Sequence, residues 1–413
     1  MSGNEFRILI AASYGHFVCH YNVSVFPALV LPLAARLNLG TGQVVELSFL
    51  QYLLFGVSAL PWGFLGDKFG GKRLLMLMFL GSSVVAVLAA LSIDSPVWLY
   101  LSLGGLGLFT GIYHPTGMAM ISKGVARLNL ALGYNAAFGG LGMVIAPLVT
   151  GIVNWLWGPR AAFLLVMALN LLGVTLLTLL LCSDPEREVK PRPETGTGMQ
   201  VEFLIFLGAM VFAGMIVTGA TVILPAYLEL HTSGIFEAME SLWGTKPSSN
   251  LFATAVTSLV YCVGMLGQFT GGLVGERYKP IASYLWFHCV CLFIAVLMAL
   301  TTELPLVFLA NIYFFFLLGT QAMENTVFAS LVPSHLHHSA FGVKYIVYFG
   351  AGALAVKMVS WIESVWGSAA IFVGLAIVSA LLVMSVRILM FRMSKKRHEL
   401  ASPQTKDSSF GQK

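Results

Sequence analysis

The sequence predicts an all-α membrane protein of twelve transmembrane helices, arranged in two pseudo-symmetric halves of six. Hydrophobic residues make up 58% of its 413 residues and charged residues only 10%, whereas about a quarter of a soluble domain is charged. A bilayer core needs about 20 apolar residues per helix. Twelve stretches of that kind are expected at 8–32, 45–65, 73–92, 97–121, 131–155, 160–182, 202–228, 250–274, 281–300, 305–330, 341–363 and 367–391.

The two halves are indicated by a glycine-rich segment that occurs twice. The first copy runs from Gly63 to Arg73 and reads GFLGDKFGGKR, and the second begins at Gly272 and reads GLVGERYK. Both keep the order Gly-x-x-Gly-acid-base-aromatic, and both follow the second apolar stretch of their half. Like half-chains of this layout are the sequence sign of a membrane transporter built by duplication.

A polar segment rich in proline and glycine, 183–201, divides the chain. We expect it to be a cytosolic linker between an N-terminal six-helix bundle, 1–182, and a C-terminal six-helix bundle, 202–392. Residues 393–413 are basic and then rich in serine and glutamine, which predicts a disordered cytosolic tail. The polar segment 229–249 allows a short surface helix, a lid or a solvated loop.

Basic residues set the orientation, because cytosolic loops carry the excess of lysine and arginine. With the N-terminus in the cytosol, that side holds Arg7, Lys68, Lys72, Arg73, Lys123, Arg127, Arg187, Lys190, Arg192, Arg277, Lys279, Lys344 and the basic residues from Arg387 to Lys413. The opposite loops hold Arg36, Arg160 and Lys246. We therefore expect a multi-pass protein of the cell (inner) membrane with both termini in the cytosol.

The segment 63–73 resembles the loop between helices 2 and 3 of the major facilitator superfamily. The residues that carry this resemblance are Gly63, Gly66, Asp67, Lys68, Gly70, Lys72 and Arg73. The resemblance implies that superfamily's fold, with Asp67 as a helix-cap and conformational-lock residue. Its implied cytosolic charge partners are Lys68, Lys72 and Arg73. The second copy matches the pattern at Gly275, Glu276 and Arg277.

Two further strings add to the resemblance. Close helix packing around a proline bend is expected in 131–155 from Gly139, Gly142, Ala146, Pro147 and Gly151. This string resembles the superfamily's antiporter signature, with Ala146 and Thr150 at two of its glycine positions. The string from Gly111 to Gly117, GIYHPTG, is similar to an element of the fosmidomycin-resistance-type efflux branch.

Polar residues inside a span are costly, so each is a candidate functional residue. His16 and His20 lie one helical turn apart in the first span. Such a pair can bind a metal, but the sequence offers no evident third ligand, so we predict a protonatable or hydrogen-bonded pair and no metal site. His114 precedes Pro115 in the fourth span. It either meets a solute beside a proline kink or is bonded to a structural neighbour.

In the C-terminal half, Gln321, Glu324 and Asn325 share one face of the tenth span. Glu324 has two interpretations: it binds a proton or solute, or it forms a structural ion pair with Lys344. Lys357 lies in the outer half of the eleventh span. It either extends its ammonium to the interface or attracts an anionic solute.

The sequence contains no hydrolase, phosphate-loop or zinc-protease motif, so we predict neither an enzyme nor an ATP-driven pump. Its basic residues lie in loops and the tail, which argues against nucleic acid as a partner. The leading hypothesis is a secondary active transporter of a small organic solute, working by alternating access and coupling efflux to protons as an antiporter. Alternatives are an uptake symporter or facilitator for an organic anion, and a non-transporting sensor or assembly protein. We expect a monomer whose partners are lipid, solute and protons, with no cofactor.

The orientation can be tested by labelling single cysteines with a membrane-impermeant reagent. Cysteines placed at Lys190 and Ser402 should react only from the cytosolic side, and one at Thr245 only from outside. Reaction at position 190 from outside would reverse the predicted topology.

Overall fold

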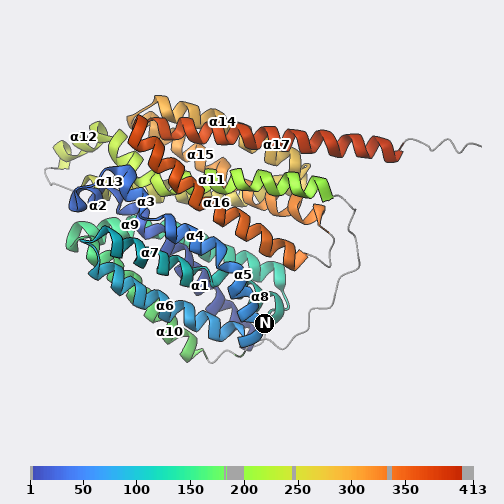
Figure 1. The fold of residues 1–413 in the computed structure, drawn as a ribbon, viewed down its shortest axis with the longest axis horizontal. Helices are drawn as coiled ribbons and strands as arrows, with labels where there is room; N and C mark the ends of the chain where they lie inside the picture. Colours follow the sequence, from blue (N-terminus) through green and yellow to red (C-terminus); the bar gives the residue numbers. More distant parts are fainter. Residues whose placement is uncertain (1–2, 181–182, 184–199, 244–247, 333–336, 402–413) are drawn as a thin grey trace, which may run out of the picture.

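The computed structural model describes residues 3–180, 183, 200–243, 248–332 and 337–401. Within these residues the regular secondary structure is entirely helical (Figure 1). The helices are α1 (Gly3–Ala28), α2 (Val30–Leu37), α3 (Thr41–Glu46), α4 (Phe49–Val57), α5 (Ala59–Phe69), α6 (Gly71–Leu91), α7 (Pro96–Thr110), α8 (Tyr113–Gly124), α9 (Leu128–Trp157), α10 (Pro159–Leu179), α11 (Gln200–His231), α12 (Ser233–Trp243), α13 (Ser249–Arg277), α14 (Pro280–Leu300), α15 (Glu303–Leu331), α16 (His337–Trp366) and α17 (Ala370–Ala401).

Ten stretches of the described chain are long and apolar enough to cross a membrane. Two more are bent: α1 with α2 at 47°, and α3–α4 with α5 at 45°. Counting each bent pair as one span gives twelve, as the sequence predicts. The protein is therefore an all-α membrane protein of the predicted class.

Three of the N-terminal spans are interrupted at the same distance before a proline. The interruptions fall at Leu29, Ser58 and Ile112, and a proline stands three residues after each, at Pro32, Pro61 and Pro115. A proline has no N–H for the carbonyl four residues back, and its ring clashes with that carbonyl. The preceding helix therefore ends, and a new helix starts with the proline in its first turn.

The contacts between spans repeat from one half to the other. In the N-terminal half the first span packs on the fifth (α1 on α9), the second on the fourth (α4 on α7) and the third on the sixth (α6 on α10). In the C-terminal half the corresponding contacts are α11 on α16, α13 on α15, and α14 on α17. The halves meet through α4 with α16 and α9 with α13, two pairs that the same symmetry relates.

The repeat extends to a turn. Gly158 ends α9 and Gly367 ends α16, each directly after a tryptophan. Both have positive φ, +81° and +80°, a backbone conformation that favours glycine because it has no Cβ. The duplicated halves therefore share local backbone geometry as well as helix packing.

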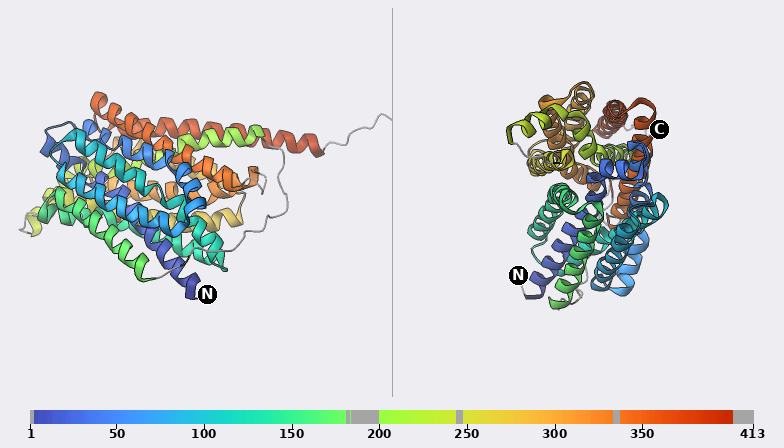
Figure 2. Two further views of the ribbon diagram at one scale, coloured as in Figure 1. Left: turned by 60° about the horizontal axis from the view of Figure 1, so that its bottom comes forward. Right: turned by 90° about the vertical axis from the view of Figure 1, so that its left-hand side faces the viewer.

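Figures 1 and 2 place the two halves side by side, with α1–α10 in one and α11–α17 in the other. The N-terminus and the far end of α17 lie at the same end of the molecule, and α2, α3 and α12 lie at the other (Figure 1). This matches a chain that crosses an even number of times. The division at 183–201 stays a prediction, since most of that segment lies outside the described residues.

Two expectations about segments outside the membrane change. The tail predicted to be disordered from residue 393 is helical to Ala401, as the end of α17. The reason is local, because the run MSKKRHEL at 393–400 consists mostly of good helix formers. Of the three options for 229–249, a short helix is present: α12 begins where Glu303 accepts hydrogen bonds from the N–H groups of Gly234 and Ile235, at 3.0 and 2.8 Å.

The fifth span, α9, packs closely on both sides of Pro147. A methyl group added at Gly142 would overlap the carbonyl oxygen of Phe17 on α1. One added at Gly151 would overlap the Thr254 hydroxyl on α13, in the other half. Ala146, between them, is fully buried. The small residues of this span therefore let α9 touch its own half and the opposite half at backbone distance.

This packing predicts that a glycine-to-alanine substitution changes stability differently at two positions of α9. Gly142→Ala should lower the free energy of unfolding by about 1–3 kcal/mol, the usual cost of overpacking. Gly133→Ala is the matched control, because a methyl group there has nothing within 4 Å, so it should be neutral or stabilising through helix propensity. Thermal unfolding in detergent measures both, and equal stability of the two variants would contradict the close contact.

Candidate functional site

The break between α7 and α8 positions His114. The Ile112 N–H donates to the carbonyl three residues back, at 3.2 Å, so the carbonyl of Leu108 loses its helical partner. The indole of Trp62 on α5 donates to that carbonyl at 2.8 Å. Satisfied in this way, the break can persist inside a membrane. It makes His114 the second residue of α8, with Pro115 behind it and its side chain buried.

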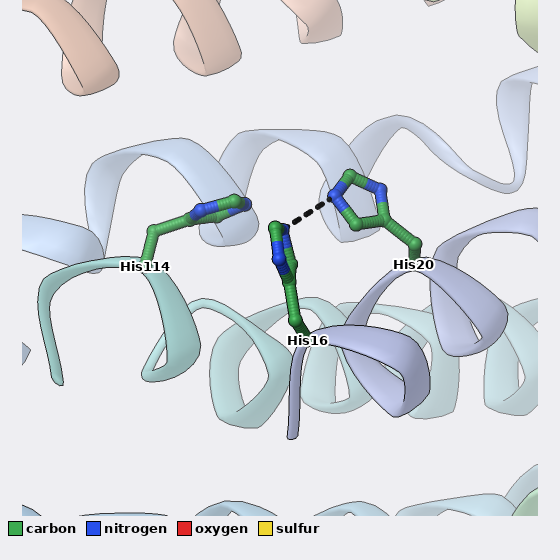
Figure 3. A group of neighbouring side chains, drawn as sticks. All are labelled: His16, His20 and His114. Atoms are coloured by element: carbon green, nitrogen blue, oxygen red, sulfur yellow. Dashed lines mark hydrogen bonds between the residues drawn. The ribbon is translucent and has the colours of Figure 1, made fainter. Parts of the chain in front are cut away.

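Three histidines meet between α1 and α8. The ring nitrogens of His16, His20 and His114 that could bind a metal all lie within 4.8 Å of one another (Figure 3). The Nε2 atoms of His16 and His20 are 3.1 Å apart. The sequence offers no evident third ligand for the pair in the first span, but the structure brings His114 beside it, from 94 positions beyond His20.

The surroundings of His16 fix which of its nitrogens carries a proton. Its Nδ1 lies 2.8 Å from the carbonyl oxygen of Asn135, and a carbonyl only accepts, so Nδ1–H is the donor. The ring stacks on Tyr113 at 4.7 Å, and the Asn135 amide donates to the Tyr113 hydroxyl at 2.7 Å. A methyl group at Gly139 would approach the ring to 2.6 Å. In the neutral ring, Nε2 therefore carries the lone pair, and it accepts a hydrogen bond from the Nε2–H of His20 at 3.1 Å.

The other half covers His114. Its ring stacks on Tyr345 and Phe349 of α16, with centroids 5.6 and 5.0 Å away. Phe55 of α4, from the same half as His114, packs edge-on against the ring at 5.8 Å between centroids. Its Nε2 is buried and has no hydrogen-bond partner among the described residues. The histidine cluster therefore belongs to the N-terminal half but lies at the interface with the C-terminal half.

Glu324 lies in a buried polar group of the C-terminal half. Its Oε1 is 2.9 Å from the ammonium of Lys344, and both side chains are only 3–4% exposed. The Tyr284 hydroxyl donates to Oε2 at 3.3 Å, and Lys344 also donates to Asn325. Of the two interpretations of Glu324, the ion pair is therefore present in this state, which leaves a role in proton binding to be proposed.

Gln321 lies one turn before this group and accepts a hydrogen bond from Gln268 of α13 at 2.6 Å. Lys357 lies further along α16 than Lys344, toward the C-terminal end of that helix. It forms an ion pair with Glu46 of α3, in the opposite half, and both side chains are about half exposed. The structure thus adds a contact between the halves that sequence spacing cannot indicate, and the two predicted roles of Lys357, at the lipid interface or on an anionic solute, stay predictions.

The predicted gating segment lies at the end of the molecule that holds the termini. Asp67, in the last turn of α5, pairs at 3.3 Å with Lys123 of α8, and the two side chains are 73% and 42% exposed. The family resemblance implies Lys68, Lys72 and Arg73 as its partners, whereas the pair in the structure is with Lys123. A cavity of about 150 Å³ lies beside the pair between α5 and α8.

The counterpart of this segment, from Gly275 to Arg277, ends α13. There the guanidinium of Arg277 lies 5.8 Å from the ring centre of Tyr278. At the opposite end, Arg36 and Arg160 both pair with Asp94, at 2.5 and 3.4 Å. The hydrogen bond from Arg36 lowers the pKa of Asp94 below its ordinary value. The carboxylate thus stays charged and is shared by two basic residues of that end.

Two repeated six-helix halves, with polar side chains buried where they face each other, define a membrane transport protein. A family model described as Major Facilitator Superfamily matches residues 12–356, and the chain belongs to this superfamily. The assignment confirms the resemblance stated from the segment 63–73.

Curated relatives and a solved structure agree with this assignment. The multidrug resistance protein MdtG of Proteus mirabilis (strain HI4320) is 26% identical over 273 residues, 65% of this chain and 64% of that protein. MdtG of Yersinia enterocolitica serotype O:8 / biotype 1B is 33% identical over 135 residues, 32% of this chain and 31% of that protein. The chain thus spans less than two thirds of the length of either relative.

The solved structure is that of a bacterial homolog of the human lysosomal transporter Spinster, in an inward-facing and unoccupied conformation. It has a TM-score of 0.71 at 16% identity, and the match covers 95% of this chain and 96% of that one. At this identity the similarity supports the fold alone.

The buried ion pair makes a stability prediction. Glu324→Gln should lower the free energy of unfolding by about 3–5 kcal/mol, because it leaves the ammonium of Lys344 buried without a carboxylate. Glu324→Gln combined with Lys344→Met should recover most of that loss. Asp67→Asn is the control, since its exposed pair with Lys123 contributes at most about 1 kcal/mol. A double variant no more stable than the single one in thermal unfolding would remove the pair as the cause.

Proposed function

We propose that the protein exports small organic solutes across the cell membrane by alternating access, in exchange for protons. The observation that carries the proposal is where the halves touch. Polar contacts between them gather where α3 meets α16 and where α9 meets α13, at the end away from the termini. The histidine cluster and the Glu324–Lys344 pair take no part in these contacts. With the termini in the cytosol, this arrangement corresponds to a state closed toward the outside.

One group of these contacts joins α3 to α16. Glu46 pairs with Lys357 and accepts a hydrogen bond from Ser360 at 3.1 Å. One turn further, the carboxylate of Glu363 accepts from the N–H of Gly42 at 2.7 Å. Carboxylates of both halves therefore take part, each held by a group of the opposite half.

The symmetry-related group joins α9 to α13. Asn154 donates to Asn250 at 3.0 Å, and the N–H of Leu148 donates to the hydroxyl of Ser258 at 2.9 Å. Asn250 also donates to the carbonyl of Ala28, at 3.0 Å. These are individually modest interactions, about 0.5–1.5 kcal/mol for a typical hydrogen bond. A closure made of several such bonds is able to open and re-form, which alternating access requires.

The proposed coupling site is Glu324. A proton on its carboxylate removes the negative partner of Lys344, so proton binding and the ion pair exclude each other. States that keep the pair and states that break it therefore differ in proton affinity, and a proton gradient shifts the balance between them. Coupling through a buried pair of this kind needs no cofactor and no covalent intermediate.

Export of organic solutes is supported by the relatives, which are multidrug resistance proteins, and by the aromatic rings of Phe55, Tyr345 and Phe349 at the interface. Such rings suit a flat, partly apolar solute. The alternative, uptake of an organic anion, has lost one of its supports because Lys357 is paired with Glu46.

Transport by membrane vesicles tests the proposal, with ethidium and fosmidomycin as probes. Everted vesicles with an acidic interior should accumulate at least one probe, and accumulation should cease when the proton gradient is collapsed. The Glu324→Gln/Lys344→Met variant should lose accumulation driven by protons but still exchange probe down its gradient, because Glu324 is needed only for coupling. Vesicles without the protein are the control.

Two results would contradict the proposal. Full accumulation by the double variant would remove the coupling role of Glu324. Accumulation only in right-side-out vesicles would reverse the direction of transport.

A further inference from the structure

We propose that His16, His20 and His114 form a binding site for a divalent late transition metal ion, with Zn²⁺ the best fit. The site lies wholly within the N-terminal half, between α1 and α8, and the proposal stands on its own whether or not the protein exports organic solutes. It does not require the halves to change their arrangement.

The donor set selects the metal. Three neutral imidazoles with one open position are a common zinc arrangement, whereas Mg²⁺ and Ca²⁺ need oxygen ligands. In the described part of the chain, the cluster contains no carboxylate. A bound ion would therefore keep its charge and attract an anionic or electron-donating fourth ligand, such as water or a solute group.

The distances are close to those a metal requires. Zinc–nitrogen bonds of about 2.0–2.1 Å in a tetrahedron place the ligand nitrogens about 3.3–3.4 Å apart. The Nε2 atoms of His16 and His20 are already 3.1 Å apart. The candidate ligand nitrogen of His114 lies within 4.8 Å of the other two. A rotation of its ring that shortens these separations by about 1–2 Å would complete the site. Figure 3 shows the three rings directed at one another.

The surrounding hydrogen bonds favour binding over a purely structural role. A metal-binding histidine usually donates its second ring N–H to a carbonyl or carboxylate, which orients the ring and leaves the other nitrogen free. His16 does this through the Asn135 carbonyl. The buried Nε2 of His114 has no partner among the described residues, and burying such a group unpaired costs about 1–3 kcal/mol. A metal ion satisfies it directly.

The cover of the site belongs to the other half. Tyr345 and Phe349 of α16 stack on the His114 ring. Because the three ligands move with one half and the aromatic cover with the other, separation of the halves uncovers the ion without dismantling its ligand set. A metal here would therefore be exchangeable in one transport state and enclosed in the other.

Equilibrium binding to the purified full-length protein tests the proposal. The protein should carry a tag without histidine, so that the only histidines present are the nine of its own sequence. Six of these lie outside the cluster. Co²⁺ is the probe, since tetrahedral cobalt absorbs strongly in the visible range, and Zn²⁺ should displace it. We expect one Co²⁺ per chain with a tetrahedral spectrum. His16→Gln, His20→Gln and His114→Gln should each weaken binding on the order of 100-fold or more, beyond the loss from an outer-shell change.

His231→Gln is the matched control and should bind Co²⁺ as the wild type does, because His231 bonds to Tyr227 on α11, outside the cluster. The variant with all three cluster histidines changed to glutamine measures binding by the remaining six. If His16→Gln does not fold because its bond to Asn135 is lost, the other two single variants decide. Unchanged affinity in His114→Gln, or equal binding by the triple variant, would overturn the site.

Discussion

The structure depends on one constraint: inside a bilayer every backbone N–H and carbonyl group needs a partner within the protein. Prolines break that rule locally, and the chain uses three of them at the same register to interrupt its first, second and fourth spans. At the third interruption the indole of Trp62 takes over the carbonyl of Leu108. This break places His114 in the first turn of α8, beside the histidines of α1.

The internal symmetry explains why the contacts between halves come in related sets. The second span packs on the eleventh, and by the same symmetry the eighth span packs on the fifth. Duplication therefore produced two closures at once. The halves have since diverged in chemistry: the N-terminal half holds neutral imidazoles at its interface, and the C-terminal half holds the compensated charges of Glu324 and Lys344.

The sequence was sufficient for the class of fold, because bilayer thickness and repeated loop motifs are local properties of the chain. It also singled out His16, His20, His114 and Glu324 as candidates, since polar residues are costly inside a membrane. It gave one partner, Lys344 for Glu324, as one of two interpretations, but it did not give the others. The pair of Glu46 with Lys357 and that of Asp67 with Lys123 join spans far apart in the chain, and His114 lies beside His16 from another span. Such contacts depend on tertiary packing, which no periodicity records.

The exposed position of the Glu46–Lys357 pair makes this contact between the halves sensitive to the salt concentration of the medium. Charges in contact with water are screened over about 10 Å at 0.1 M salt and about 3 Å at 1 M. Ionic strength therefore acts on this closure but hardly on the buried Glu324–Lys344 pair. Concentrated salt would therefore weaken this contact between the halves and leave the buried pair nearly unchanged, so the balance between joined and separated halves would depend on the salt concentration.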